Sequence, residues 1–132
     1  MEAATRATNR LIINELDYDM SDDVLRCESL ARGLNSYQYH IFRSVIDAHH
    51  RGDGELFFLY GSGGKGKTYL WNTIISKFRS EKCIVLAVAS SRIASLLLPG
   101  GKTAHSVFRI SLQPDETSIS FVDKRSEHAE LI

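Results

Sequence analysis

The chain has 132 residues, of which 43% are hydrophobic and 24% are charged, and it holds only two prolines. This composition is typical of one small globular domain and excludes disordered and collagen-like chains. No apolar run reaches the roughly 18–20 residues of a membrane span, and the first residues, MEAATR, lack the apolar centre of a secretory signal. We therefore expect a soluble intracellular protein with no membrane partner. Cys27 and Cys83 lie far apart without metal-ligand spacing, so neither a disulfide partner nor a zinc site is expected.

The charges balance overall but are unevenly distributed along the chain. Sixteen basic residues match sixteen acidic ones. From Gly61 to Leu112 the basic residues are Lys65, Lys67, Lys77, Arg79, Lys82, Arg92, Lys102 and Arg109, against Glu81 alone. From Asn14 to Glu28 acidic residues dominate instead. Such asymmetry is typical either of ordinary solvated helix faces or of a basic surface for a polyanion.

The central part of the chain predicts a helix followed by a strand. Apolar residues recur at helical spacing between Asn35 and His50, and Gly52 supplies a stop signal. Leu56–Tyr60 is a short apolar run without alternation, which favours a strand buried on both faces of a parallel sheet.

After a glycine-rich turn, a helical pattern runs from near Lys67 to Ser80, and a second apolar run of strand length covers Cys83–Ala89. Strand, helix and strand in this order predict a βαβ unit, and hence an α/β fold with a parallel sheet flanked by helices. We also expect a short helix over Arg92–Leu98, closed by the turn Pro99–Gly101. Thr103–Leu112 has no clear assignment, and Ser126–Ile132 at most begins another element.

The glycine-rich turn is the most informative motif. Residues 61–68 read GSGGKGKT, which matches the pattern G-x-x-x-x-G-K-[ST] between a predicted strand and a predicted helix. Such a loop curls its backbone N–H groups around an anion, and the following helix adds the positive end of its dipole. The motif predicts a nucleoside triphosphate site formed by Gly61, Ser62, Gly63, Gly64, Lys65, Gly66, Lys67 and Thr68. Lys67 would reach the β and γ phosphates, and the Thr68 hydroxyl would be a magnesium ligand.

Three segments together with this loop resemble one family. They are Leu34–Gln38, Ala87–Ala94 and Pro99–Phe108, and the last contains the discriminating sequence GGKTAHS. Over most of the chain, the combination is similar to the Pif-type ATP-dependent DNA helicases of superfamily 1B. Within that family it most resembles the plant and Helitron-like members. The resemblance implies an incomplete RecA-like P-loop domain over residues 34–132, preceded by an acidic extension over residues 1–33 that is partly helical or disordered.

The resemblance also implies roles for individual residues. Gln38 would contact adenine through its amide, although Asn35 and Gln38 also match a capping box at the start of a helix. Residues facing DNA would be Ser90, Ser91, Arg92, Lys102, Thr103, His105 and Ser106. His105 is equally compatible with a buried, hydrogen-bonded histidine. The implied cofactors are ATP and Mg²⁺, and the implied partner is single-stranded or forked DNA.

The chain departs from the family pattern in three places. Lys65 stands where threonine is usual, and Arg92 stands where glycine is usual. The apolar strand ending in Asp-Glu, which supplies the catalytic carboxylates of the family, is missing, so no catalytic residue is assigned. Asp115-Glu116 does not replace it, because Leu112-Gln113-Pro114 is not an apolar strand.

The sequence therefore predicts part of an ATP-dependent DNA helicase, truncated before the Walker B strand and inactive alone. The resemblance further implies 5′–3′ movement, a role in DNA repair, recombination or telomere maintenance, and a location in the nucleus or, alternatively, the mitochondrion. A non-enzymatic nucleotide- or single-stranded-DNA-binding module and, more remotely, a small nucleoside kinase remain alternatives. We also expect the apolar strand edges and aromatic side chains, including Phe57, Phe58 and Trp71, to need a partner surface.

Overall fold

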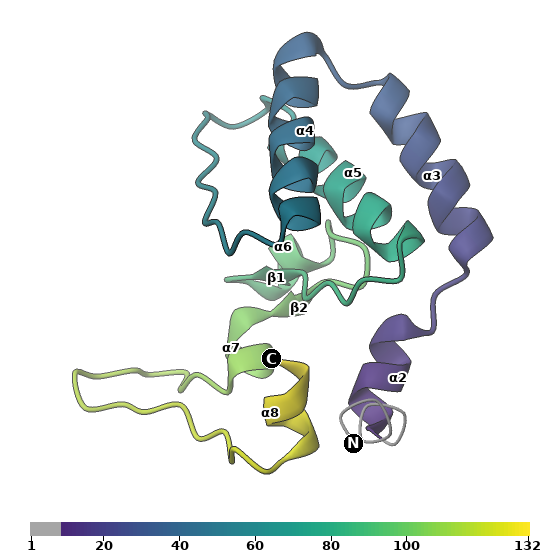
Figure 1. The fold of residues 1–132 in the computed structure, drawn as a ribbon. Helices are drawn as coiled ribbons and strands as arrows, with labels where there is room; N and C mark the ends of the chain where they lie inside the picture. Colours follow the sequence, from purple (N-terminus) through teal and green to yellow (C-terminus); the bar gives the residue numbers. More distant parts are fainter. Residues whose placement is uncertain (1–8) are drawn as a thin grey trace. The chain divides into compact units, whose positions relative to one another are not determined.

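The computed structural model describes residues 9–132, and the chain within them is mostly helical with one small parallel sheet (Figure 1). The chain divides into two compact units. One unit combines the N-terminal residues up to Tyr18 with Cys83–Ile132, and the other is Asp19–Lys82. Residues 1–8 of the expected N-terminal extension lie outside the described residues. Among the residues that the structure describes, no helix has the length and apolar character needed to cross a membrane.

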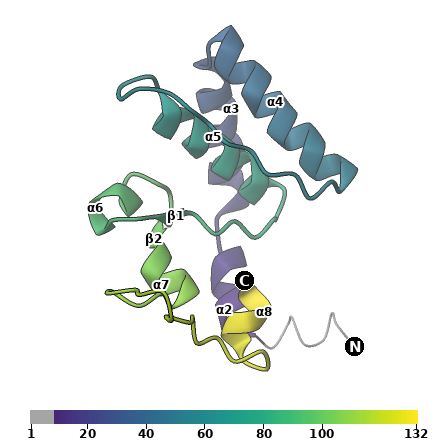
Figure 2. The same cartoon turned by 90° about the vertical axis from the view of Figure 1, so that its left-hand side faces the viewer.

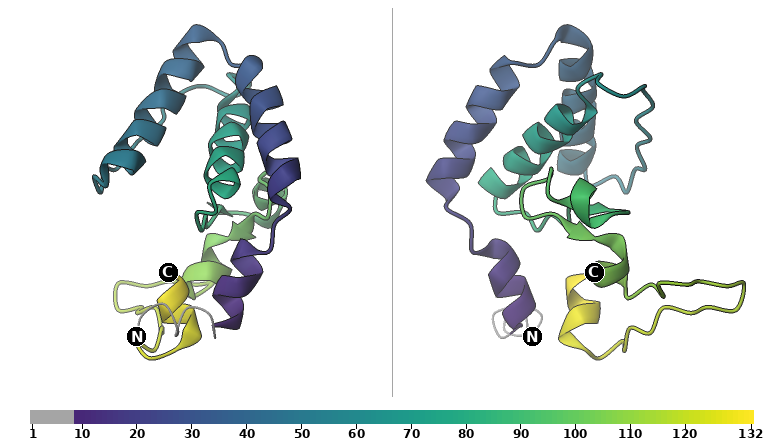
Figure 3. Two further views of the ribbon diagram at one scale, coloured as in Figure 1. Left: turned by 45° about the vertical axis from the view of Figure 1, so that its right-hand side comes forward. Right: turned by 180° about the vertical axis from the view of Figure 1, so that it is seen from behind.

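The unit Asp19–Lys82 is built from helices α3 (Met20–Arg32), α4 (Ser36–Arg51) and α5 (Lys67–Ser80). Helix α5 packs against both α3 and α4 and lies between them (Figures 1 and 3). The core is formed by Phe42 and Ile46 of α4 with Leu70 and Ile74 of α5, all at most 7% exposed. These apolar residues recur every three to four positions, which places them on one face of each helix. The predicted helices over Asn35–His50 and from Lys67 to Ser80 are therefore confirmed to within a residue or two.

Local signals explain where α4 begins and ends. The Asn35 Oδ1 accepts the Gln38 backbone N–H at 2.9 Å, and the Gln38 Oε1 accepts the Asn35 backbone N–H at 3.1 Å. This capping box satisfies two donors that a helix start leaves unpaired. At the other end Gly52 has φ +75°, a left-handed conformation that glycine adopts without steric cost.

Helix α3 is joined to α5 by a hydrogen bond from a side chain of α5 to the backbone of α3. The Tyr69 hydroxyl donates to the Leu30 carbonyl at 2.7 Å. A Cβ at Gly33 would lie 2.2 Å from this hydroxyl, so only glycine leaves room for the contact. At the far end of α5, burial alone would raise the pKa of Glu81, but hydrogen bonds from Lys77 and His50 outweigh it and hold the pKa below its usual value. The carboxylate thereby ties α4 to α5 in its charged form.

The predicted strand over Leu56–Tyr60 is wrong in this structure. The segment has no regular secondary structure and pairs with no strand among residues 9–132, and Leu56, Phe58 and Tyr60 are 98%, 89% and 89% exposed. An apolar run indicates a tendency to be buried, but a strand also needs a neighbour for its backbone hydrogen bonds. The predicted βαβ unit built on this strand is therefore not formed either.

The second unit contains helix α2 (Arg10–Leu16) and all elements after Lys82. Strands β1 (Val88–Ala89) and β2 (Lys102–Thr103) pair in parallel, with Val88 opposite Lys102 and Ala89 opposite Thr103. Helix α6 (Arg92–Ser95) connects them, and α7 (Ala104–Phe108) follows β2 (Figure 2). Helix α8 (Glu127–Leu131) packs against α2.

Two predictions for this unit are only partly confirmed. The expected strand over Cys83–Ala89 forms only at its last two residues, and the expected helix over Arg92–Leu98 ends at Ser95. The helix is shortened because the chain turns before Pro99 and approaches itself closely: a Cβ at Gly101 would lie 2.1 Å from the Ser95 carbonyl oxygen. Asp115 lies in an exposed turn, where hydrogen bonds from Ser118 and Thr117 lower its pKa. This agrees with the interpretation that Asp115-Glu116 belongs to a loop and does not end a strand.

Candidate functional site

The phosphate-loop motif forms a turn that leads directly into helix α5. Gly64 and Gly66 have φ of +74° and +76°, in the left-handed region that favours glycine. Gly66 is the N-cap of α5, so Lys67 and Thr68 occupy the first turn of the helix. The first N–H groups of a helix have no partner within it, and they point toward its N-terminal end. The loop therefore presents backbone donors and a helix terminus in the place that the motif predicts for an anion.

The Lys67 side chain lies back over the start of the loop. Its ammonium donates to the carbonyl oxygens of Gly61 at 2.5 Å and Ser62 at 2.7 Å. An ammonium has three protons, so one donor remains for a further acceptor. The lysine charge is thus fixed at the loop that the motif assigns to phosphate.

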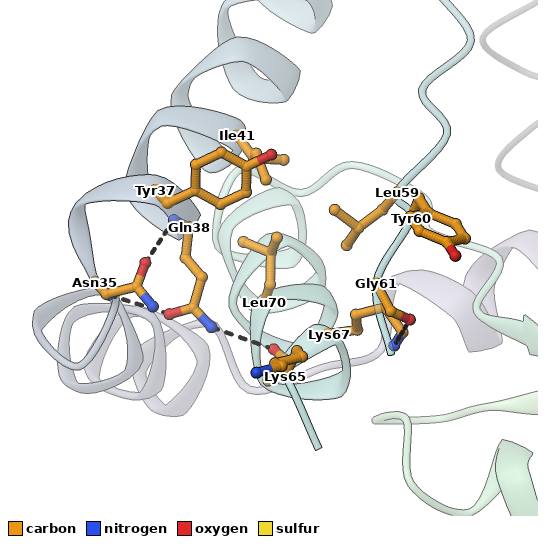
Figure 4. A pocket seen from close by; sticks show the side chains of 11 residues that line it. Asn35, Tyr37, Gln38, Ile41, Leu59, Tyr60, Gly61, Lys65, Lys67 and Leu70 are labelled. Atoms are coloured by element: carbon orange, nitrogen blue, oxygen red, sulfur yellow. Dashed lines mark hydrogen bonds between the residues drawn. The ribbon is translucent and has the colours of Figure 1, made fainter. Parts of the chain in front are cut away.

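Gln38 connects helix α4 to the same loop. Its Oε1 closes the capping box with Asn35, and its Nε2 donates to the Gly66 carbonyl oxygen at 3.5 Å (Figure 4). The capping-box interpretation of Asn35 and Gln38 is therefore confirmed. The adenine contact stays a prediction. The bonds to Asn35 and Gly66 leave room for it, because the Gln38 amide keeps one oxygen lone pair and one N–H after making them.

These residues line a pocket of about 300 Å³ within the unit Asp19–Lys82. Its polar lining comes from Asn35, Gln38 and the loop, and its apolar lining from Tyr37 and Ile41 of α4, Leu59, and Leu70 of α5. Figure 4 shows the Gln38 amide between Asn35 and the loop, with Leu70 and Lys67 on the neighbouring helix. An apolar wall suits a nucleobase, and the loop with Lys67 suits phosphate, so this pocket fits a nucleotide.

The loop glycines allow a graded test of this geometry. We expect Gly63→Ala to leave stability within about 0.5 kcal/mol, because Gly63 has no left-handed backbone and no neighbour within 4 Å of a Cβ. Gly64→Ala should cost about 1–2 kcal/mol through its positive φ alone. Gly66→Ala should cost at least as much, since its φ is also positive and its Cβ, 2.5 Å from the Gln38 Nε2, would displace that flexible amide from the Gly66 carbonyl oxygen. Urea unfolding of the three variants measures the order, and equal stability of Gly63→Ala and Gly66→Ala would contradict the described loop.

The metal prediction rests on Thr68. This residue is exposed in the first turn of α5, where its hydroxyl supplies one oxygen ligand. Magnesium commonly takes its remaining ligands from substrate phosphates and water. The structure leaves this role a prediction.

The residues predicted to face nucleic acid come together in the other unit. Ser90, Ser91 and Arg92 directly follow β1, and Ser106 belongs to the helix that follows β2. Because Ala89 pairs with Thr103 in parallel, the two segments begin at the same edge of the small sheet. Ser90, Arg92 and Ser106 are exposed. Carboxyl ends of parallel strands are common ligand sites in open α/β sheets.

Two hydroxyls at this edge act as helix caps. Ser91 Oγ accepts from the Ala94 backbone N–H at 3.1 Å, and Thr103 Oγ1 accepts from Ser106 at 3.3 Å. Each hydroxyl keeps its own O–H to donate. His105 is half-buried, so neither of its two interpretations is decided.

The structure adds a partner that the sequence analysis missed. The Lys102 ammonium pairs with Glu15 of α2, whose side chain is only 7% exposed, whereas that of Lys102 is 50% exposed. Nothing in the local sequence links residues so far apart. By contrast, Tyr37 and Ile41 could have been assigned to the nucleotide pocket, since they lie one helical turn apart and flank Gln38.

Comparison with known proteins identifies the family. A profile described as PIF1-like helicase matches residues 33–132. The chain is 33% identical over 73 residues to the ATP-dependent DNA helicase Pif1 of Campylobacter jejuni, a match covering 55% of this chain and 16% of the relative. It is 38% identical over 78 residues to the ATP-dependent DNA helicase PIF4 of Trypanosoma brucei brucei, covering 59% of this chain and 9% of the relative. The chain thus matches a small part of each relative, and on the family match over residues 33–132 it belongs to the PIF1-like helicases.

Proposed function

We propose that this chain supplies the ATP-binding part of an ATP-dependent DNA helicase. The observation that carries the proposal is the pocket of about 300 Å³ that joins Gln38, the glycine loop and Lys67. Membership of the PIF1-like helicases supports it, as does the fact that both relatives are ATP-dependent DNA helicases.

The residues of the pocket fit ATP in two parts. Tyr37, Ile41 and Leu70 provide apolar surface for the base, and the Gln38 amide has a free donor and acceptor for its edge. Lys67 and the loop N–H groups would hold the β and γ phosphates, with Mg²⁺ at the Thr68 hydroxyl. Bound Mg²⁺ neutralises phosphate charge, and Lys67 adds a positive charge that stays fixed by the loop carbonyls.

In this proposal the nucleic-acid partner is single-stranded DNA, bound at the shared edge of β1 and β2. The exposed Arg92 guanidinium and the Ser90, Ser91 and Ser106 hydroxyls suit phosphate oxygens, which accept most protein–DNA hydrogen bonds. The residues proposed to bind DNA also include Lys102, Thr103 and His105.

The test is titration of the purified chain with a fluorescent ATP analogue and Mg²⁺. Lys67→Ala should weaken binding by about 10- to 100-fold, because charge-assisted hydrogen bonds contribute roughly 1.5–3 kcal/mol. Lys124→Ala is the matched control, since Lys124 is an exposed lysine outside the pocket and should leave binding unchanged. Equal binding by the wild type and Lys67→Ala would refute the proposed site.

Adding single-stranded DNA to the same titration separates the helicase proposal from a non-enzymatic module. Simultaneous binding of the ATP analogue and DNA supports two sites, as the helicase proposal requires. Competition between them would instead indicate a single anion site in the loop.

The finer proposals extend the family resemblance to the complete helicase. They are 5′–3′ movement on single-stranded or forked DNA, a role in repair, recombination or telomere maintenance, and a nuclear location. Expression of the tagged protein, scored for nuclear or mitochondrial signal, tests the location. Equal binding of forked and unforked single strands would argue against the fork preference.

A further inference from the structure

Helix α2 is fixed by one buried face within the unit that also contains β1, β2 and α8. Asn9, Ile12 and Glu15 follow one another at intervals of three residues, and all three are at most 6% exposed. This spacing places them on the same side of the helix. The Asn9 amide donates to a backbone carbonyl of α8 at 2.9 Å and to a carboxylate of α8 at 2.8 Å, so α8 holds the start of α2 (Figure 2).

The last turn of α2 is held in a different way, by an ion pair with the first residue of β2. The buried Glu15 carboxylate accepts from the Lys102 ammonium. Lys102 directly precedes Thr103 at the edge proposed to bind DNA. The other cation proposed there, Arg92, is exposed and forms no ion pair within residues 9–132. Of these two cations, the chain therefore neutralises Lys102 with its own carboxylate and leaves Arg92 to solvent.

A carboxylate and a phosphate both bind an ammonium through charge-assisted hydrogen bonds, so each can replace the other at Lys102. A phosphate that takes the ammonium would leave Glu15 buried without its cation, which is strongly unfavourable. The carboxylate escapes this cost only if the last turn of α2 moves into water. Phosphate binding at Lys102 and the docked position of α2 therefore oppose each other, and this coupling acts equally in both directions.

We propose that α2 is an autoinhibitory element, whose Glu15 occupies Lys102 in place of a backbone phosphate of single-stranded DNA. Binding of DNA at the shared edge of β1 and β2 releases the last turn of the helix, while the Asn9 contacts keep its start on α8. The inference rests on the DNA site proposed above and adds its regulation. It does not involve the nucleotide pocket.

The test is fluorescence anisotropy of a labelled single-stranded oligonucleotide titrated with the nucleotide-free chain. Glu15→Gln removes the competing charge and should tighten DNA binding at least about fivefold, the lower end of typical coupling between two sites. Asp17→Asn is the matched control: it removes an equal charge from the exposed residue that caps the same helix, and screening should limit its effect to about twofold. Glu15→Gln/Lys102→Met should bind no more tightly than the wild type, because the released cation is gone.

Amide hydrogen exchange tests the release without any substitution. Saturating DNA should speed exchange of residues 13–16 in the wild type, and slower exchange there would overturn the inference. Arg92→Ala separates this inference from the DNA site itself. If Arg92→Ala weakens DNA binding but Glu15→Gln binds like the wild type, the DNA site stands and autoinhibition by α2 is wrong. If neither the wild type nor any variant binds DNA, both proposals are wrong.

Discussion

Replacing Leu70 with alanine is expected to destabilise the unit Asp19–Lys82 by about 2–5 kcal/mol, the usual cost of truncating a buried leucine. Leu70 is 1% exposed and lies in the core with Phe42, Ile46 and Ile74. The substitution removes apolar contacts and leaves a cavity between α4 and α5. The unit is small, so it has few other core residues to compensate for the loss. A loss of this size is a large fraction of the roughly 5–15 kcal/mol that holds a typical domain folded.

Urea unfolding followed by tryptophan fluorescence measures this effect locally. Trp71 is the single tryptophan of the chain and packs on this core, so its emission reports this unit. Leu25→Ala, at an exposed position of α3, is the control and should change stability by no more than about 0.5 kcal/mol. Similar midpoints for the two variants would show that Leu70 does not lie in the core as described.

The sequence predicts the helical parts of this unit well because their signals are local. Asn35 and Gln38 form the capping box that starts α4, and Gly52 adopts the left-handed conformation that ends it. The loop from Gly61 to Thr68 likewise requires glycine where φ is positive, and two of its glycines have that backbone. Each of these signals acts within a few residues, so the chain around it matters little.

The sequence predicts the strands less well, because a strand depends on a pairing partner. Leu56–Tyr60 has the composition of a strand, but no described strand pairs with it. Val88–Ala89 forms a strand only where Lys102–Thr103 lies beside it. Hydrophobic pattern reports how strongly a segment favours burial, whereas pairing is decided by residues distant in sequence.

The same limit applies to the candidate nucleic-acid residues. The family resemblance points to Lys102, but no sequence pattern indicates its ion-pair partner in α2. That partner is Glu15, in a part of the chain that composition alone describes as an acidic extension. Burial of the glutamate depends on how α2 packs, which no local pattern reports.

The Lys102–Glu15 pair leads to the second prediction with a large effect. Lys102→Met should destabilise the unit containing α2 by about 3 kcal/mol, the lower end of the range for breaking a buried ion pair. The lower end applies because the Lys102 side chain is half exposed, while Glu15 is left buried without its cation. Helix α2 should loosen, although its Ile12 remains buried and its N-cap Asn9 still donates to the Glu127 carbonyl and the Glu130 carboxylate.

Amide hydrogen exchange of residues 10–16, together with urea unfolding followed by circular dichroism, measures this change. Lys124→Met is the control and should leave both unchanged, because Lys124 is exposed. The double variant Glu15→Gln/Lys102→Met should recover much of the stability lost in Lys102→Met, since it no longer buries an uncompensated charge. If the effects of the two single changes simply add, the two side chains do not interact. Recovery would instead show that Glu15 draws its main compensation from Lys102, so that any phosphate bound by Lys102 must compete with a carboxylate of the chain itself.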